Sequence, residues 1–394
     1  MIERIDVHPV TLPMVRPFTH AGNRRTRTAS VLVSVEADGV RGWGEGAPRL
    51  YVTGETVETV CETLAELTPQ SLNAMIDLGD FGSAMCRLAE LDLARLLGGA
   101  GRPQPAAAAA LEIALFDLIC RVHGQPGIAG LRSVPAAAGL LCPIAVPKRV
   151  SLVLDLNDQP AVRLALLDPE TRKAVRHVKL KATADIAGCV GRVADVRDRV
   201  GPDVGISVDV NGDWDPDTAV RAAKLLRPLA VTWLEEPVAA RDWAAMRRVQ
   251  DVGGVPVMLD ESCSGLTDLE TATAERAAAY VNARISKCGG IFPTLALIAA
   301  AREHGIGAQL GVHVAEVGPL WAAARLVSCA VSFLVTVEAG KQEEWFPTPY
   351  TDPPYAVDRR GYLAHPLTGA GIGIVPSQTL LDTLHPNPKG SIHV

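Results

Sequence analysis

Five ionisable residues recur at nearly equal intervals through the middle of the chain. Successive members are 28, 26, 25 and 27 residues apart, and each follows a short apolar run. Each interval has the length of one strand and one helix. Side chains at the C-terminal ends of parallel barrel strands converge on one mouth, so we expect these groups to surround a single cavity. They are Lys181, Asp209, Glu235, Asp260 and Lys287.

Three of these groups are carboxylates: Asp209, Glu235 and Asp260. Carboxylates that converge in a buried site repel one another, and some would become protonated unless a cation balances them. A ligand set made only of oxygen favours a hard ion, and three protein ligands leave coordination positions open for substrate oxygens. The pattern predicts a Mg²⁺ site, with Mn²⁺ as a substitute. Helix caps or salt bridges at strand ends are the structural alternative.

Lysines flank the carboxylates on both sides. Lys179 and Lys181 share one face of their strand, and Lys287 comes from a strand several places further round. Like charges two residues apart lower each other's pKa, which suits a base that works near neutral pH. The chemistry that fits is removal of a proton next to a carboxylate. The metal would neutralise the enolate, and lysines on opposite faces would remove and return the proton.

Alternation of side chains tests which residues face the barrel interior. Asp209 and Asn211 share one face of their strand, as Lys179 and Lys181 do on theirs. The strand that leads to Lys287 fits less well. With Lys287 directed inward, three polar residues of this strand would face the helices instead: Asn282, Arg284 and Ser286.

The elements that must position these residues begin near residue 140. Short β-branched runs alternate with Ala-rich amphipathic stretches, which implies right-handed βαβ crossovers and a parallel sheet. An eighth strand must precede the seven runs, from either 140–146 or 150–154, and eight strands predict a closed barrel. The seven runs cover 176–182, 204–210, 230–236, 255–261, 278–287, 306–312 and 331–338.

The first part of the chain has a different pattern. Residues 1–50 alternate with a period of two in three runs, and Asp38-Gly39 has the composition of a hairpin turn. Helical spacing follows at 53–67 and 106–123. We therefore predict an α+β unit over 1–130, a barrel domain over 131–346, and a Pro- and Gly-rich C-terminal segment over 347–394 that returns to the first unit.

Composition excludes several classes of function. The 394 residues include 48% apolar and 21% charged residues, with a net charge of −6, so a large core is expected and no basic footprint for nucleic acid exists. Eight cysteines without a CxxC pair argue against zinc or iron–sulfur sites and against a disulfide framework. The chain has no run of about 18 apolar residues and no signal pattern. These features predict a cytoplasmic protein that binds a small molecule rather than a membrane.

Several motifs together resemble those of the enolase superfamily, within it the muconate lactonizing enzyme group of the mandelate racemase/muconate lactonizing enzyme family. The resemblance implies a (β/α)7β TIM-like barrel with an N-terminal α+β capping domain completed by the C-terminal tail, and the use of a lysine base with Mg²⁺. It also implies a homo-oligomer. The motifs are KLK at 179–181, DVN at 209–211, LEEP at 234–237, LDES at 259–262, KCGG at 287–290, GWGE at 42–45 and YVTGET at 51–56.

The resemblance implies roles for the ionisable residues that recur at nearly equal intervals. Asp209, Glu235 and Asp260 would bind the metal, Lys181 and Lys287 would form the acid/base pair, and Lys179 would assist Lys181. The second lysine argues against the mandelate racemase group, whose later strands carry a His–Asp dyad. The candidate substrate-binding residues lie outside this series: His20, Tyr51, Asn211, His313 and Glu316. Arg24 and Arg25 are further candidates, and the capping loops are expected at 16–27 and 48–56.

The combined prediction is a Mg²⁺-dependent enzyme that removes the α-proton of a small-molecule carboxylate. An isomerase is favoured: a cycloisomerase, or a racemase or epimerase of an amino-acid derivative. Dipeptide epimerases usually carry Asp-x-Asp near the eighth strand, where this chain has VEAG at 337–340, which weighs against that activity. The alternatives are a lyase that uses the same enolate, an aldolase with a Schiff base at Lys287, and a non-catalytic binding protein.

Overall fold

The computed structural model describes residues 1–20, 23–99, 101–156, 158–338, 344–354, 356–358 and 363–384, apart from the side chains of residues 20, 23 and 24. An antiparallel sheet of three strands opens the chain, in the order β1-β2-β3. Asp38 and Gly39, with φ of +51° and +73°, form the predicted turn between β2 and β3. The strands are β1 (Ile2–His20), β2 (Asn23–Ala37) and β3 (Val40–Gly46).

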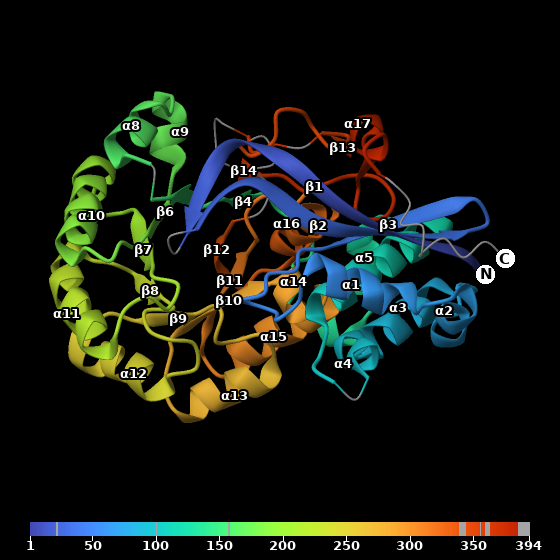
Figure 1. Ribbon diagram of the computed structural model, residues 1–394, viewed down its shortest axis with the longest axis horizontal. Coiled ribbons are helices and arrows are strands. Elements are labelled where there is room, and N and C mark those ends of the chain that lie inside the picture. Colours follow the sequence, from blue (N-terminus) through green and yellow to red (C-terminus); the bar gives the residue numbers. More distant parts are fainter. Residues whose placement is uncertain are drawn as a thin grey trace.

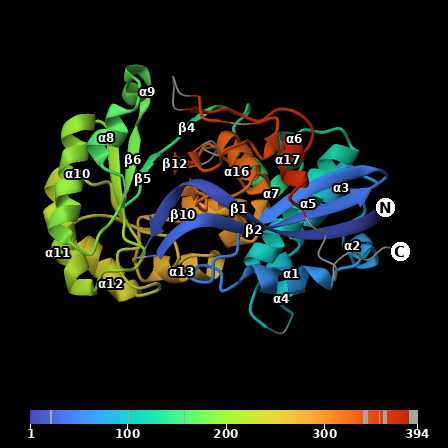
Figure 2. The same ribbon diagram turned by 45° about the horizontal axis from the view of Figure 1, so that its top comes forward.

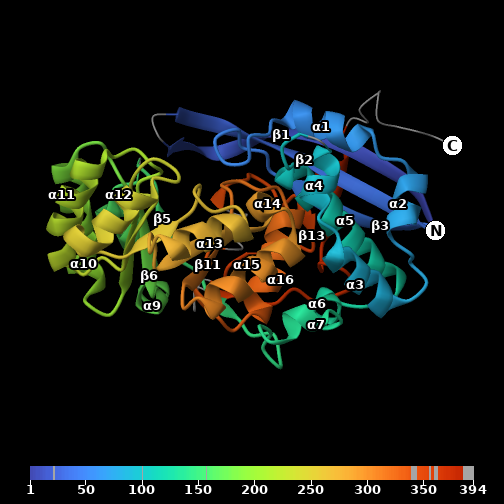
Figure 3. The same cartoon turned by 90° about the horizontal axis from the view of Figure 1, so that it is seen from below.

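The hairpin of β1 and β2 is longer than the sequence pattern predicts. The expected loop at 16–27 lies mostly within these two strands, which pair up to His20 and Asn23 after a register shift between Pro13 and Phe18. A bulge of this kind lets a strand bend and continue. The hairpin therefore extends beyond the rest of its sheet and over the barrel (Figure 3).

Helices cover one face of this sheet, and the longest of them packs directly on β3. Gly42, Gly44 and Gly46 face α5, where a Cβ on Gly44 would lie 1.9 Å from the main-chain oxygen of Ala110. Only glycine, which has no Cβ, allows the helix and the strand to approach this closely. The helices are α1 (Val57–Ala65), α2 (Pro69–Met75), α3 (Phe81–Glu90), α4 (Leu93–Gly98), α5 (Pro105–Val122), α6 (Gly127–Arg132) and α7 (Pro135–Ala138).

Eight parallel strands form the predicted barrel (Figure 1). They follow one another in sequence order, and a parallel bridge between Val150 and Val337 joins the first strand region to the last. This bridge places the first strand at the second of the two segments considered. The strands are β5 (Leu152–Leu154), β6 (His177–Lys181), β7 (Gly205–Asp209), β8 (Trp233–Glu235), β9 (Val257–Leu259), β10 (Tyr280–Arg284), β11 (Gly307–Gly311) and β12 (Leu334–Val337).

Helices alternate with these strands and cover the outside of the barrel (Figure 1). Their inward faces carry small and branched apolar residues, as the Ala-rich stretches predict. They are α8 (Pro160–Ala165), α9 (Pro169–Ala174), α10 (Ile186–Val200), α11 (Pro216–Leu226), α12 (Trp243–Arg248), α13 (Leu266–Ala274), α14 (Ile285–Cys288), α15 (Ile291–Glu303) and α16 (Pro319–Ala330), with single turns at Arg227–Leu229 and Val249–Gly253. Within the described ranges, no helix has both the length and the apolar character needed to cross a bilayer.

The C-terminal segment returns to the α+β unit (Figure 2). Ile372 N donates to Asp117 on α5 at 2.8 Å, and Arg121 donates to the main-chain oxygen of Ile374 at 2.6 Å. The domain boundaries remain a prediction. The remaining elements are β4 (Lys148–Arg149), which pairs with β14 (Leu363–Ala364), β13 (Thr351–Asp352), which pairs with β15 (Val375–Pro376), and α17 (Gln378–Leu381).

Buried carboxylates fasten the α+β unit to the barrel. Glu45, at the end of β3, accepts hydrogen bonds from Gly318 N at 2.9 Å and Leu320 N at 3.2 Å, at the start of α16. Glu112 on α5 accepts one from Phe292 N at 2.9 Å, at the start of α15. Unpaired N–H groups at a helix N-terminus attract anions. The sheet and α5 are thereby held in a fixed position over the barrel mouth.

Candidate active site

Three buried carboxylates end adjacent barrel strands, as predicted. Asp209 ends β7, Glu235 ends β8 and Asp260 follows β9, and each is at most 1% exposed. Lys179 lies among them. Its Nζ is 2.7 Å from Glu235 Oε1, 3.1 Å from Asp209 Oδ2 and 3.0 Å from Oε1 of Glu338. One ammonium group therefore holds three carboxylates together at the barrel mouth.

Lys181 is the second lysine of β6 and is the more exposed of the two, at 9% against 3%. Its Nζ is 2.6 Å from Asp209 Oδ2 and donates to Asn211 Oδ1 at 2.7 Å. The Asn211 amide in turn donates to Glu261 Oε1 at 3.1 Å. The parity predicted for β6 and β7 thus brings Lys179, Lys181, Asp209 and Asn211 to one place.

Lys287 lies elsewhere. The strand β10 ends at Arg284, and Lys287 follows one turn later in α14, with a side chain that is fully buried. Its Nζ donates to the main-chain oxygens of Asp260 at 2.6 Å and Asn282 at 2.7 Å, and lies 3.0 Å from Asp260 Oδ1. Lys287 does not belong to the lining of the cavity, whereas Arg284 does.

This placement explains the misfit in the alternation of β10. Asn282 faces inward, where its amide donates to Glu235 Oε1 at 2.9 Å. Arg284 also faces inward and pairs with Asp260, and its Nη2 lies 3.7 Å from Glu235 Oε1. Asn282 and Arg284, which appeared to face the helices, are thus the inward residues, because the strand ends before Lys287 and the period of two does not continue through the helical turn. Ser286 lies in that turn, where its hydroxyl accepts from Ala47 N at 3.0 Å.

The charges of the site shift the pKa values of its members. Burial lowers the pKa of Lys179, but the carboxylates of Asp209, Glu235 and Glu338 outweigh it, and this pKa is raised. Burial and the nearby Asp209 raise the pKa of Glu235 well above its usual range. The pKa of Asp260 is lowered, because the cations Arg284 and Lys287 outweigh burial.

The donor set suits a divalent cation. Glu235 Oε2 is buried and has no hydrogen-bond partner within the described residues, and burial together with the nearby Asp209 raises the pKa of this carboxyl. As the side chains stand, Lys179 and Arg284 bridge the carboxylates, and no group of three acidic, His or Cys side chains in the described ranges is spaced to hold a metal. A hard cation on Asp209, Glu235 and Asp260 would take over the balancing of charge that the two cationic side chains provide.

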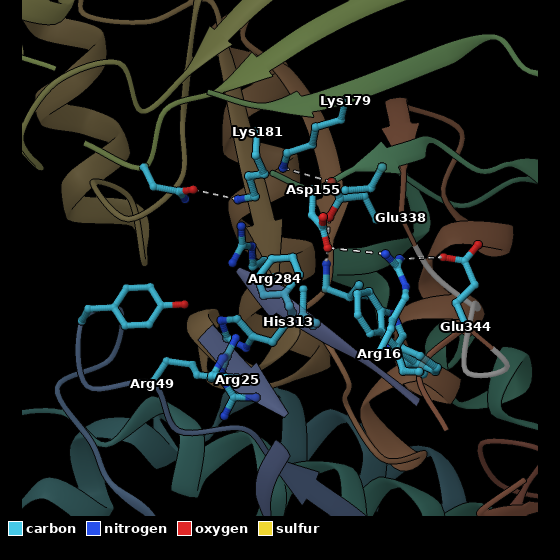
Figure 4. Close-up of a pocket in the computed structure, with 18 of the residues that line it drawn as sticks. Arg16, Arg25, Arg49, Asp155, Lys179, Lys181, Arg284, His313, Glu338 and Glu344 are labelled. Carbon is cyan, nitrogen blue, oxygen red and sulfur yellow. Dashed lines mark hydrogen bonds and ion pairs between the residues drawn. The ribbon is translucent and has the colours of Figure 1, made fainter. Parts of the chain in front are cut away.

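A cavity opens above these residues, between the barrel and the hairpin of β1 and β2 (Figure 4). Arg16 bridges the two parts: its guanidinium lies 3.4 Å from Asp155 Oδ2 at the end of β5 and 3.8 Å from Glu344 Oε2. Tyr51, 54% exposed, lines the cavity from the segment expected to do so. Further lining residues are Phe18, Arg25, Arg49, Lys179, Lys181, Asn211, Glu261, Arg284, His313, Trp321, Glu338 and Trp345.

The other predicted contacts divide into three cases. His313 lines the cavity and is buried, and burial together with Arg284 lowers the pKa of its imidazole, which favours the neutral form. Glu316 is buried outside the lining, where its Oε1 accepts from His313 N at 2.8 Å. The helix start near it is bound by Glu45 instead. The side chains of His20 and Arg24 lie outside the described part of the chain.

Several residues that line the cavity were not among the sequence candidates, and three of them are charged groups close to the site: Glu338, Arg284 and Arg49. Glu338 directly follows β12, so the same strand-end rule could have found it. Arg284 could have been found from the alternation of β10. Arg49 lies in the expected capping loop at 48–56 but was not singled out there. Its guanidinium reaches the cavity from the α+β unit while it donates to the main-chain oxygens of residues 29 and 48.

Comparison with known families agrees with this architecture. Residues 166–380 match the model described as enolase C-terminal domain-like, and residues 2–131 match the mandelate racemase/muconate lactonizing enzyme N-terminal domain. The chain belongs to the mandelate racemase/muconate lactonizing enzyme family of the enolase superfamily. The predicted fold class is confirmed, and the chain is an enolase-superfamily enzyme.

Relatives within this family are isomerases. An N-succinyl-L-Arg/Lys racemase of Bacillus cereus is 28% identical, over 79% of this chain and 80% of the relative. Its crystal structure has a TM-score of 0.81, with 97% of each chain covered. A chloromuconate cycloisomerase of Pseudomonas putida is 25% identical, over 79% of this chain and 80% of the relative. A dipeptide epimerase of Enterococcus faecalis, solved with Mg and L-Leu-L-Tyr, has a TM-score of 0.78 at 25% identity, covering 95% of this chain and 99% of that chain.

Proposed function

We propose that this enzyme is a Mg²⁺-dependent isomerase that removes the α-proton of a small-molecule carboxylate and passes through an enolate. The observation that carries the proposal is the position of Lys181. Its Nζ lines the cavity 2.6 Å from a buried carboxylate of the adjacent strand, beside two further buried carboxylates. A base next to a cluster of anionic oxygens is what enolate chemistry needs.

The metal site of the proposal consists of Asp209, Glu235 and Asp260. Its support is the unpartnered buried oxygen of Glu235 and the all-oxygen donor set. When bound, Mg²⁺ would supply positive charge to the substrate carboxylate and to the enolate. Mn²⁺ is proposed as a substitute, since it accepts the same oxygen ligands.

Lys181 is the proposed base and Lys179 the residue that positions it. Lys181 reaches the cavity, and its contact with Asn211 Oδ1 at 2.7 Å directs the amine. Lys179 also lines the cavity but is less exposed, and it is bound to Glu235 and Glu338. It therefore keeps the carboxylates of the site in register.

Two observations bear on the other reactions considered. A Schiff base at Lys287 would need an amine that a carbonyl substrate can reach, and this amine is fully buried with three hydrogen bonds. A lyase that expels a β-leaving group needs the same enolate, so Lys181 and the carboxylates serve it equally well.

We also propose that the enzyme is a cytoplasmic homo-oligomer.

Proton NMR in D₂O tests the proposal. The native enzyme would be incubated with Mg²⁺ and pooled α-substituted carboxylates, including N-succinyl amino acids, dipeptides and muconolactone. We expect loss of an α-proton signal, which stops on addition of EDTA and is absent in Lys181→Ala. The product spectrum separates isomerase from lyase. Exchange that is unaffected by EDTA would contradict the metal, and exchange that survives in Lys181→Ala would contradict the base.

A further inference from the structure

The two sides of the cavity carry different kinds of cation. Among the eight strands, β6 is second and β10 is sixth, so four strand steps separate them in either direction round the barrel. Side chains at the ends of these strands therefore lie on opposite walls of the mouth. Lys181 ends β6 and Arg284 ends β10, and both line the cavity. A substrate carbon held above the carboxylates would lie between an amine and a guanidinium.

Lys287 cannot take the place of Arg284 in this arrangement. All three N–H groups of its ammonium have an acceptor: the main-chain oxygens of Asp260 and Asn282 and the Asp260 carboxylate. Lys287 is not among the residues that line the cavity, and its side chain is 0% exposed. Moving the amine to the substrate would break three buried hydrogen bonds.

Arg284 is well placed to bind negative charge. Its Nη2 pairs with Asp260, while its Nε is buried without a hydrogen-bond partner within the described residues. A guanidinium carries five N–H donors and no acceptor, and it stays charged in proteins. It can donate to a carboxylate or an enolate oxygen, but it cannot take a proton from carbon.

We infer that proton transfer in this enzyme is one-sided: Lys181 alone exchanges a proton with the α-carbon, and Arg284 binds the substrate's negative charge on the opposite wall. The inference rests on the proposed function and narrows it. The C–H bond breaks toward Lys181, its electron pair enters the enolate, and the neutral amine becomes an ammonium. The reverse step returns the proton to the same face.

This geometry selects one class of isomerase. Interconversion of two stereoisomers at the α-carbon needs a proton donor on each face, and Arg284 supplies none. An intramolecular addition or elimination needs only one. In that reaction a substrate carboxylate oxygen forms a C–O bond at the β-carbon, the electron pair of the C=C bond moves into the enolate, and the Lys181 ammonium protonates the α-carbon. The reaction favoured is therefore that of a cycloisomerase rather than a racemase or epimerase.

Stereospecific exchange tests the inference. Both enantiomers of N-succinyl-lysine and of muconolactone would be incubated separately with native enzyme and Mg²⁺ in D₂O. We expect one stereoisomer of the accepted compound to exchange its α-proton at least 100-fold faster than the other, with no interconversion. Arg284→Lys, which places an amine on the second wall, should raise exchange of the slow isomer at least tenfold. Interconversion of both isomers at similar rates by the native enzyme would overturn the inference.

A second measurement depends on no substrate and no variant. The native protein would be acetylated with sulfosuccinimidyl acetate, and the labelled lysines would be mapped by mass spectrometry. Lys181 should react at least tenfold faster than Lys287, and Lys287 should react only after unfolding in guanidinium chloride. Equal labelling of the two would overturn the inference. If no compound exchanges in the native enzyme, the proposed function fails, and this labelling still decides which lysine faces the cavity.

Discussion

Lys287 Nζ donates a 2.6 Å hydrogen bond to the main-chain oxygen of Asp260 and lies 3.0 Å from the carboxylate of the same residue. The lysine thus fixes Asp260 through Oδ1 without lining the cavity, while Arg284 pairs with Oδ2 and does line it. Because only one of the two cations reaches the cavity, they have different consequences. One holds the end of β9 in place, and the other is available to the substrate.

Removal of the Lys287 amine should destabilise the protein. Lys287→Met removes the ion pair with the buried Asp260 carboxylate and the hydrogen bond to the Asn282 carbonyl, and breaking a buried ion pair costs about 3–5 kcal/mol. Urea unfolding followed by circular dichroism measures the free energy of unfolding. The control is Lys173→Met, at a lysine whose side chain is 76% exposed and which should change stability by less than about 0.5 kcal/mol. Equal effects of the two substitutions would contradict the structural role.

Much of this site could be predicted from the sequence alone, because residues at the C-terminal ends of parallel barrel strands all lie at the same mouth of the barrel. The spacing of Lys181, Asp209, Glu235 and Asp260 is a property of the repeated strand and helix, so it carries three-dimensional information. Lys287 has the same spacing by coincidence. An interval measured along the chain does not reveal where β10 ends and α14 begins. Arg284 and Lys287 are three residues apart, and the spacing selected the buried lysine instead of the arginine that faces the cavity.

Contacts between distant segments were beyond the reach of periodicity. Glu45 and Glu112 belong to the α+β unit, yet each binds the N-terminus of a barrel helix some 180 to 275 residues later. Their sequence neighbourhoods give no indication of that partner. Arg16 and Arg49 enter the cavity by the same kind of docking. Such residues depend on how two units pack together, which local patterns do not encode.

Removal of the proposed base should abolish α-proton exchange. Lys181→Ala deletes the amine that faces the cavity, and loss of a general base typically lowers a rate by 10²–10⁴-fold. The readout is deuterium incorporation into the compound that the native enzyme accepts. Lys173→Ala serves as the control for a lost surface lysine. Unchanged thermal unfolding would exclude a folding defect, and near-native exchange in Lys181→Ala would rule out the assigned base.

Loss of one charged ligand should weaken metal binding. Asp260→Asn keeps the shape of the side chain but removes a negative charge from the proposed Mg²⁺ site, and we expect at least a tenfold increase in Kd for Mg²⁺. Isothermal titration of chelator-treated protein with MgCl₂ measures it. Glu303→Gln, on an exposed part of α15, is the matched control and should leave Kd unchanged. Identical affinities in all three proteins would mean that the metal site is elsewhere.

The close packing of β3 on α5 should tolerate no added methyl group. In Gly44→Ala the new Cβ would lie 1.9 Å from the main-chain oxygen of Ala110, so the helix or the strand must move. Overpacking of this kind costs about 1–3 kcal/mol and more where backbone must shift. Gly139→Ala is the control, since nothing lies within 4 Å of its Cβ position. Urea unfolding of the two variants should separate them, and equal midpoints would contradict the packing.

Stability should fall as pH rises, because of Glu236. Burial and the neighbouring Glu261 raise its pKa from 4.5 to about 8. The folded state therefore binds more protons than the unfolded state between these values, and the free energy of unfolding decreases from about pH 4.5 to about pH 8. One pKa unit corresponds to about 1.36 kcal/mol, so the decrease is on the order of several kcal/mol.

Glu236→Gln should remove this part of the pH dependence. The amide imitates the protonated acid: its oxygen can accept from Asp260 N, at 2.7 Å from Glu236 Oε2, while its NH₂ group faces the Ser262 hydroxyl. Urea unfolding in EDTA at pH 5 and pH 8 measures the effect, and EDTA keeps metal binding from contributing. We expect the variant to be the more stable protein at pH 8 and to match the native protein at pH 5. A native protein that is equally stable at both pH values would show that Glu236 ionises at no cost and that the buried carboxyl is not protonated in the folded state.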